Sequence, residues 1–327
     1  MTQSAPQKPL PAGYRLGDYT VVRQLSVGGF SIVYLALDDQ ERTFAIKEYL
    51  PHSLACRSEQ FAVTVKNELD RDAFNLGLKC FFEEGRVLAG IHHPNVVRVS
   101  NFFRANHTVY MVMEYADGRP LSRELELAGG RLAERRLRRV FAHLVAGLRE
   151  VHLNRLLHLD LKPANIYLRR NGAPLLLDFG AARETLMRGS RQFASMYTPG
   201  FAAPEQYQRD GALGPWTDIY AIGACLYTCM GGTPPPPANE RVQHDALAPA
   251  RDAFAAYYSP ELAALTDRCL ALSPDERPAS LMQLQKLLMA EGYAAPATQR
   301  AEPALVEGGD VPSRLVSWLK HITRRVE

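Results

Sequence analysis

The sequence predicts an α+β fold in two lobes, with a small strand-rich lobe followed by a larger, mainly helical one. In the first third of the chain, short runs of Val, Ile, Tyr and Phe alternate with polar residues, which is typical of strands. From Leu132 onward, apolar residues recur at helical spacing instead. With 46% hydrophobic and 22% charged residues, the chain of 327 residues has the composition of a globular protein with a sizeable core.

The elements of the strand-rich lobe follow from its local patterns. Three antiparallel strands are expected between Tyr19 and Lys47, where "VGG" and "LDDQER" mark the turns. A helix is expected at 74–91, because its apolar residues are spaced for one helical face. Two further strands are expected at 96–103 and 109–115. The joint between the lobes is placed near 114–118, and a long helix with an apolar face from Leu137 to Val151 follows in the second lobe.

Charge, cysteines and hydropathy exclude several classes of protein. The chain has 38 basic and 35 acidic residues, a net charge of +3, which predicts no nucleic acid partner. Its five cysteines contain no C-x-x-C pair and suit a reducing compartment, and Cys225 and Cys229 are expected to be core residues. We expect a cytoplasmic protein, because the N-terminus lacks a signal-peptide pattern and the apolar run 219–230 is too short to span a bilayer.

The two ends of the chain differ in composition from the rest. Residues 1–18 are rich in proline and are expected to form a flexible leader. Residues 291–312, rich in Ala, Pro, Gly and Glu, are typical of a linker. Residues 313–327 place apolar residues on one face of a short basic amphipathic helix. Such a helix can associate weakly with a membrane surface, dock on a partner protein or pack against its own domain.

The candidate phosphate-binding residues lie at a turn between two expected strands. A nucleotide phosphate requires backbone N–H groups close to its oxygens, a cation, and oxygen ligands for the accompanying metal ion. In the sequence "SVGGFSIV", 26–33, the glycines permit close approach of the backbone, so Val27, Gly28 and Gly29 are candidates. A Gly-Gly pair on its own is more often only a hairpin turn.

The candidate cation is Lys47 in "FAIKEY". A lysine at the surface is the usual case, but apolar neighbours on a strand indicate a side chain that needs a counter-charge if it points inward. Glu84, on the helix expected next, can supply that charge.

Four polar residues further along the chain complete a candidate catalytic group. In "LHLDLKPANIYL", Asp160 can accept a proton from a hydroxyl or orient it, Lys162 can neutralise a transferring phosphoryl group, and Asn165 can offer a metal its carbonyl oxygen. Asp178 follows an apolar strand in "LLLDFG" and is well placed to bind Mg²⁺. Each residue alone is more often a turn former or a helix cap, but their order and spacing favour one joint site.

The sequence resembles the eukaryotic-like (Hanks-type) bacterial serine/threonine protein kinases from about Tyr19 to about Leu288. The resemblance rests on motifs in family order: the Gly-rich loop, "AIK", "EEGRVLAGIHHPN", "MVMEY", "HLDLKPAN", "DFG", "TPGFAAPE", "WTDIYAIG" and "DERP". It implies a bilobal protein-kinase-like fold, with an N-lobe at 19–115, a C-lobe at 116–290, and ATP and Mg²⁺ bound where the lobes join.

The resemblance also implies a role for each candidate residue. Lys47 would contact the ATP phosphates and pair with Glu84, Asp160 would be the catalytic base, and Asn165 and Asp178 would hold Mg²⁺. The residues implied around the adenine are Val33, Ala45, Met113, Glu114, Ala116 and Tyr167. Beyond the chemistry, Glu205 would pair with Arg277, Asp218 would brace the catalytic loop, and Thr198 would contact Asp160 and Lys162.

Lys162 and Thr198 match the serine/threonine branch of the family, which implies protein substrates with Ser or Thr acceptors. Two alternatives stay open. A pseudokinase would bind nucleotide or none and signal by its conformation, although a scaffold has no chemical need for all five of Lys47, Glu84, Asp160, Asn165 and Asp178. A small-molecule phosphotransferase on a related fold is disfavoured by the full "TPGFAAPE" segment, which would line a peptide-binding surface.

Three departures from the family pattern carry their own expectations. Ser26 and Ser31 stand where glycines are usual, which predicts a looser phosphate loop. The stretch between Lys47 and Glu84 is longer than usual, and "ACRSEQFAVTV" within it predicts an added hairpin beside the Glu84 helix. Leu159 replaces the Arg that would bind a phosphorylated activation segment, so activity is expected not to depend on such phosphorylation.

Overall fold

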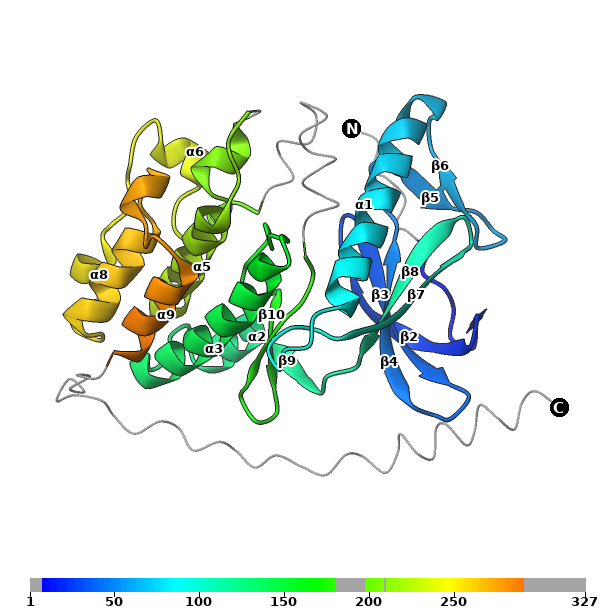
Figure 1. The fold of residues 1–327 in the computed structure, drawn as a ribbon, viewed down its shortest axis with the longest axis horizontal. Helices are drawn as coiled ribbons and strands as arrows, with labels where there is room; N and C mark the ends of the chain where they lie inside the picture. Colours follow the sequence, from blue (N-terminus) through cyan, green and yellow to red (C-terminus); the bar gives the residue numbers. More distant parts are fainter. Residues whose placement is uncertain (1–7, 180–197, 209, 291–327) are drawn as a thin grey trace. The chain divides into compact units, whose positions relative to one another are not determined.

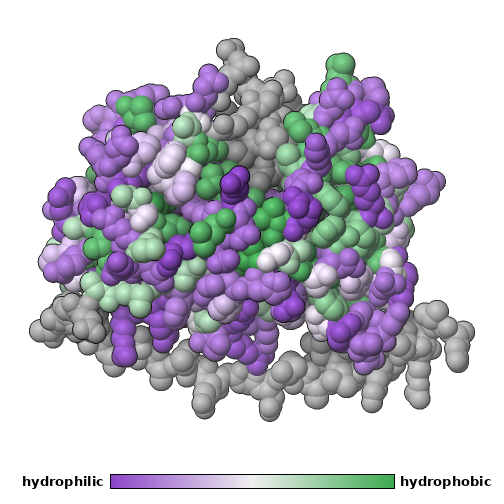
Figure 2. All heavy atoms as spheres, in the orientation of Figure 1, coloured by the Kyte–Doolittle hydropathy of each residue, from purple (hydrophilic) through white to green (hydrophobic). Residues whose placement is uncertain are grey.

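A computed structural model of the protein describes residues 8–179, 198–208 and 210–290. Within them a strand-rich lobe precedes a helical lobe along the chain, as Figure 1 shows. Hydrophobic residues are visible near the middle of the face drawn in Figure 2, where the two lobes meet, and hydrophilic residues cover much of the rest. The predicted α+β class with two lobes is therefore confirmed.

The strand-rich lobe contains one antiparallel sheet of six strands, in the order β1-β2-β3-β4-β8-β7. Its strands are β1 (Arg15–Leu16), β2 (Tyr19–Val27), β3 (Ser31–Asp38), β4 (Thr43–Tyr49), β7 (Val99–Ala105) and β8 (Thr108–Glu114). These include the three strands expected between Tyr19 and Lys47 and the two expected at 96–103 and 109–115. The central strand β4 lies between β3 and β8 and carries the residues Ile46, Lys47, Glu48 and Tyr49, all of which are buried.

Helix α1 (Arg71–Ala89) packs against this sheet, where a helix was predicted at 74–91. Phe74, Phe81 and Leu88 lie on its buried face, at intervals of seven residues, which is about two turns and places side chains on the same side of a helix. The rings of Phe74 and Phe81 contact the ring of Tyr49 on β4, with centroids 5.4 and 5.6 Å apart. The aromatic contacts fix the helix over one face of β4.

The predicted hairpin is present in the stretch between β4 and α1. Strands β5 (Ala55–Arg57) and β6 (Val63–Val65) pair antiparallel, with Ala55 opposite Val65. Leu54, just before the hairpin, and Val63 on β6 are buried. A short 3₁₀ helix η1 (Glu68–Asp70), capped by the side chain of Asn67, connects the hairpin to α1.

The expectation of a flexible leader over residues 1–18 is wrong for the segment 10–16. Leu10 and Leu16 are only 2% and 1% exposed, and β1 pairs with β2. The backbone N–H of Leu10 also donates a hydrogen bond to the hydroxyl of Tyr34 at 3.2 Å. The segment is packed because its leucines cover the face of the sheet opposite α1, an apolar surface that would otherwise meet water.

The second lobe is built mainly from helices. They are α2 (Leu121–Leu127), α3 (Glu134–Leu153), α5 (Pro215–Gly231), α6 (Ala238–Arg241), α7 (Ala250–Ala253), α8 (Pro260–Cys269) and α9 (Leu281–Met289), with 3₁₀ turns η3 (Pro204–Tyr207) and η4 (Pro274–Glu276). The long helix α3 is the one predicted from its apolar face. Helix α5 is buried along most of its length, and Cys225 and Cys229 are core residues on it as predicted. None of the helices in the described part of the chain has the length and apolar character that crossing a membrane requires.

A small three-stranded sheet lies where the lobes join, in the order β11-β10-β9. Its strands are β9 (Gly118–Pro120), β10 (Ile166–Arg169) and β11 (Pro174–Leu176). The loop 158–165, which contains three of the predicted site residues, leads into β10, and Asp178 follows β11 by two residues. The sheet thus places both catalytic segments at the joint between the lobes.

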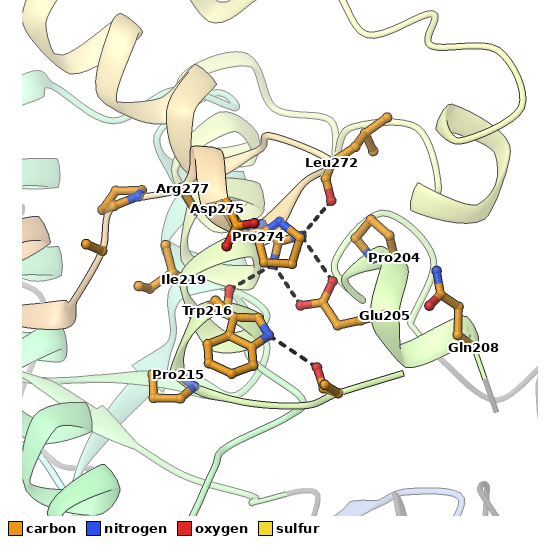
Figure 3. Close-up of a pocket in the computed structure, with 13 residues that line it drawn as sticks. Pro204, Glu205, Gln208, Pro215, Trp216, Ile219, Leu272, Pro274, Asp275 and Arg277 are labelled. Atoms are coloured by element: carbon orange, nitrogen blue, oxygen red, sulfur yellow. Dashed lines mark hydrogen bonds and ion pairs between the residues drawn. The ribbon is translucent and has the colours of Figure 1, made fainter. Parts of the chain in front are cut away.

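One ion pair lies deep in the helical lobe. The guanidinium of Arg277 donates hydrogen bonds to both carboxylate oxygens of Glu205, at 2.7 and 3.0 Å, and its side chain is fully buried. Figure 3 shows the pair beside a cavity of about 560 Å³ that Trp216 and several prolines also line. Among the described residues, none of the predicted catalytic or nucleotide-binding residues lines this cavity.

Several expectations fall outside the described residues. They are the linker at 291–312, the amphipathic helix at 313–327 and the activation-segment positions 180–197.

Replacing Arg277 by Met should lower the free energy of unfolding by roughly 3–5 kcal/mol, because Glu205 would remain buried without its cation. Chemical denaturation monitored by circular dichroism measures this change. Arg251, whose exposed side chain lies 3.6 Å from Asp267, provides the control, and its replacement by Met should cost less than about 1 kcal/mol. Equal losses in the two variants would contradict the structural role given to the buried pair.

Candidate active site

Lys47 lies between two carboxylates from different elements. Its Nζ atom, on β4, is 3.8 Å from Oε1 of Glu84 on α1 and 3.4 Å from Oδ1 of Asp178, which follows β11. Burial on its own would lower the pKa of Lys47, but Asp178 and Glu84 outweigh it and raise this pKa above its ordinary value. The lysine is therefore charged at neutral pH, and it joins strand, helix and loop through one ammonium group.

The loop before β10 brings a second group of polar atoms together. Asp160 accepts hydrogen bonds from the side-chain amide of Asn165 at 2.9 Å and from the hydroxyl of Thr198 at 3.1 Å. Lys162 Nζ lies 3.1 Å from the Asp160 carboxylate and donates to the Thr198 hydroxyl at 3.0 Å. The contacts expected for Thr198 are therefore present. The carboxylate is held in one orientation by three partners.

This catalytic loop contains a residue in an unfavourable backbone conformation. Leu159 has a φ of 60°, in the left-handed region that residues other than glycine rarely adopt. Asp218, at the start of α5, accepts the backbone N–H of Leu159 at 2.8 Å and that of His158 at 2.9 Å. Gln206 donates its side-chain amide to the Leu159 carbonyl at 3.1 Å. These bonds hold the turn that orients Asp160.

Asp218 can brace the loop because it keeps its charge while fully buried. Burial would raise its pKa, but hydrogen bonds from His152 and from the backbone of His158 lower it below the ordinary range. The ring of His152 lies 2.7 Å from the carboxylate. Sequence reasoning predicted Asp218 but missed His152 and Gln206, because both act across long separations that no local pattern reveals.

His158 connects the catalytic loop to the segment that carries Asp178. Burial lowers its pKa, so its ring is neutral. One ring nitrogen accepts the backbone N–H of Asp160 at 3.4 Å and the other lies 2.9 Å from the carbonyl of Leu177, so the second carries the proton and donates. The ring also packs against Phe179, with centroids 4.6 Å apart. This bridge, which sequence reasoning did not single out, couples the positions of Asp160 and Asp178.

Three of the residues implied around the adenine, Val33, Ala45 and Met113, share one face of the large sheet with Lys47. In the strand register, Val33 lies opposite Lys47 and Ala45 lies opposite Met113, so all four side chains project from the same face. Glu114 ends β8, and Ala116 lies just beyond it in the joint. Tyr167 on β10 donates its hydroxyl to the carbonyl of Gly118 at 2.8 Å. The sheet thus aligns the lysine with an apolar strip beside the joint.

The glycine-rich turn between β2 and β3 is exposed and tied down at its tip. Gly28 donates its backbone N–H to the carbonyl of Ser31 at 2.8 Å, which closes the turn around Gly29. The backbone N–H of Leu50 donates to the carbonyl of Phe30, and the backbone N–H of His52 donates to the carbonyl of Gly29, each at 2.8 Å. The segment that leads into the hairpin therefore fixes the turn that contains Val27, Gly28 and Gly29.

The donor set fits a hard cation accompanied by phosphates. Asn165 uses its amide nitrogen toward Asp160, which leaves its carbonyl oxygen for a metal, and the Asp178 side chain is 40% exposed. Oxygen ligands of this kind suit Mg²⁺. No group of three or more His, Cys, Asp or Glu side chains gathers for a metal in the described parts of the chain.

These features together define a protein of the kinase class, and comparisons with known proteins agree. A model of the protein kinase domain matches residues 19–289. The apo form of PpkA-294 is 38% identical, with a TM-score of 0.79, over 86% of this chain and 99% of that chain. Serine/threonine-protein kinase PknA of Nostoc sp. is 30% identical over 274 residues, which are 79% of this chain and 44% of PknA.

The chain belongs to the protein kinase family, and the resemblance to Hanks-type kinases is confirmed. It spans less than half the length of the curated relatives it matches. One of them, the inactive serine/threonine-protein kinase PLK5 of Mus musculus, is 34% identical over 209 residues, which are 62% of this chain and 34% of PLK5. Because this relative is named as inactive, similarity alone does not decide activity, and the site residues must.

Replacing Lys47 by Ala should weaken binding of Mg–ATP roughly ten- to hundredfold, the effect of losing one charge-assisted hydrogen bond. Isothermal titration calorimetry measures the dissociation constant directly. Lys79, an exposed residue on α1, is the matched control, and its replacement by Ala should leave the affinity unchanged. Parent affinity in the Lys47 variant would argue against a phosphate-binding lysine.

Proposed function

We propose that the protein is an ATP-dependent serine/threonine protein kinase. The observation that carries this proposal is the convergence of Lys47, Glu84 and Asp178 on one ammonium group, beside an Asp160 carboxylate held by Asn165, Lys162 and Thr198. A pseudokinase scaffold has no chemical need to keep both the charged cluster around Lys47 and the hydrogen-bonded Asp160 carboxylate. The five cysteines are free thiols, which supports a reducing compartment such as the cytoplasm.

The proposed reaction begins at Asp160. Its carboxylate orients the substrate Ser or Thr hydroxyl and takes its proton as the oxygen attacks the γ-phosphorus of ATP. The bond from that phosphorus to the β–γ bridging oxygen breaks, and ADP leaves with the electron pair. Lys162, 3.1 Å from Asp160, stabilises charge on the transferring group, while Lys47 holds the α- and β-phosphates. Mg²⁺, held by Asn165 and Asp178, would neutralise the phosphate oxygens.

We also propose that control does not run through phosphorylation of the activation segment. Leu159 takes the place of the arginine that would bind such a phosphate, and with Thr198, Phe201 and Ala202 it lines a small cavity. An apolar side chain there makes no charge-assisted bond. The loop conformation is supported instead by Asp218 and Gln206, which are present whether or not a phosphate is added. Autophosphorylation would then be a by-product or a docking mark.

The reaction is tested by two Asn variants in an assay with Mg²⁺, labelled ATP and casein as a generic acceptor. Asp160→Asn should lower kcat by about 10²–10⁴-fold and leave Mg–ATP affinity unchanged, because its carboxylate faces the hydroxyl. Asp178→Asn should abolish transfer and also weaken Mg²⁺-dependent nucleotide binding, because it removes a metal ligand. Unchanged transfer in either variant, or no transfer by the parent protein, would sink the kinase assignment in favour of the scaffold.

Control is tested by replacing Thr185, Ser190 and Ser195 with Ala together. All three lie outside the described residues and are the candidate phosphorylation positions of the activation segment. The initial rate of the triple variant should match that of phosphatase-treated parent protein. A tenfold loss, equivalent to about 1.4 kcal/mol of barrier, would mean that phosphorylation acts through some cation other than the missing arginine.

A further inference from the structure

Strand β4 carries two buried charges of opposite sign on adjacent residues. In the register with β3 and β8, Lys47 lies opposite Val33, while Glu48 lies opposite Ile32 and Tyr110. Because neighbouring side chains of a strand point to opposite faces, Lys47 projects toward α1 and Glu48 projects away from it. Both lie in the protein interior, at 7% and 0% exposure. The proposed reaction uses the lysine and leaves the glutamate unexplained.

Glu48 is satisfied entirely by the hairpin and by the sheet. Its Oε2 atom pairs with the guanidinium of Arg57 on β5, and both side chains are 0% exposed. The same oxygen accepts the hydroxyl of Tyr34 at 2.8 Å, and Oε1 accepts the hydroxyl of Tyr110 at 2.6 Å. A carboxylate this deeply buried requires a cation, and Arg57 supplies it.

Arg57 in turn joins two segments that lie outside the large sheet. Its Nε atom donates to the backbone carbonyl of Lys8 at 2.7 Å, and Nη1 donates to the carbonyl of Phe61 at 3.0 Å. The first bond fixes the N-terminal segment, whose Leu10 covers this face of the sheet, and the second fixes the tip of the hairpin. All three nitrogens of the Arg57 guanidinium thus donate hydrogen bonds, and a lysine could not reproduce this arrangement.

The residues on either side of the hairpin connect it to the glycine-rich turn and to helix α1. Leu50 and His52 hold the carbonyls of Phe30 and Gly29, and the chain continues from β6 through η1 directly into α1. Lys47 is therefore held from one face by Glu84 and Asp178, and its strand is held from the other face by Arg57.

We propose that the Glu48–Arg57 pair is a positioning element of the nucleotide site, which fixes β4 and so sets where the Lys47 ammonium lies relative to Glu84 and Asp178. The inference rests on the proposed function only in taking Lys47 as a phosphate-binding residue. Without Arg57, water would enter to solvate the buried Glu48, and the ion pair that joins β4 to the hairpin would be lost. A displacement of about 1 Å at a positioned group is enough to lower a rate or an affinity strongly.

The test compares Arg57→Met, Arg57→Lys and the double variant Glu48→Gln/Arg57→Met with the parent protein. The matched control is Arg277→Met, because Arg277 and its carboxylate partner Glu205 are also both buried, at 0% and 8% side-chain exposure, but lie in the helical lobe. For each folded variant we would measure the melting temperature, KM for ATP, KM for casein, and the Kd of Mg–ATP by calorimetry.

Arg57→Met should raise KM and Kd for ATP by about tenfold, with KM for casein unchanged. Arg57→Lys should raise KM and Kd for ATP by less than Arg57→Met does. Arg277→Met should lower the melting temperature by a comparable amount and leave both ATP constants at the parent values. Parent ATP constants in Arg57→Met would overturn the proposal, because the pair would then contribute to stability alone.

The double variant covers the case in which Arg57→Met does not fold. It removes both buried charges, so it avoids an unpaired carboxylate while still losing the tether. Its ATP constants should be raised as well, and parent values there would equally overturn the proposal. If the parent protein binds Mg–ATP but transfers no phosphoryl group, the proposed function fails, and the calorimetric Kd values still decide the role of the pair.

Discussion

The arrangement of the site depends on burying one lysine ammonium without leaving its charge uncompensated. Lys47 is nearly inaccessible to water, so Glu84 and Asp178 must approach it from a helix and from a loop. That requirement fixes two elements near Lys47: helix α1, which carries Glu84, and the segment after β11, which carries Asp178. The aromatic contacts of Tyr49 with Phe74 and Phe81 support the same placement, and the short connection through the hairpin limits where the helix can begin.

The helical lobe also contains a buried charge that must be compensated, the carboxylate of Asp218. Asp218 holds an unfavourable backbone turn at Leu159, so the energy stored in that turn is offset by hydrogen bonds from a rigid helix. His158 then transmits the loop position to the segment that carries Asp178, which itself has a φ of 53°. The two lobes are thus linked through the same pair of segments that carry the chemistry.

Local signals in the sequence predicted most of the elements. The alternation of apolar and polar residues predicted the strands around Lys47, and the helical spacing of apolar residues predicted α1 and α3. A strand-turn-strand pattern predicted the hairpin at 55–65. The sequence did not reveal the packing of residues 10–16, because a proline-rich stretch with two leucines carries no periodic signal. Nor did it reveal that Arg57 pairs with Glu48, or that His152 pairs with Asp218, 66 positions away. Partners of buried charges are set by tertiary structure, and a single sequence holds no pattern that identifies them.

Strand β4 belongs to a sheet with two covered faces, one beneath α1 and one beneath the N-terminal segment. The second face contains Leu10, Leu16 and Tyr34, and it also holds the Glu48 carboxylate. The match to the protein kinase domain begins only at residue 19. A shortened chain that starts there would look complete by its motifs, yet it would lack both leucines and the Lys8 carbonyl. The packed structure of this domain therefore begins upstream of the boundary that its family motifs suggest.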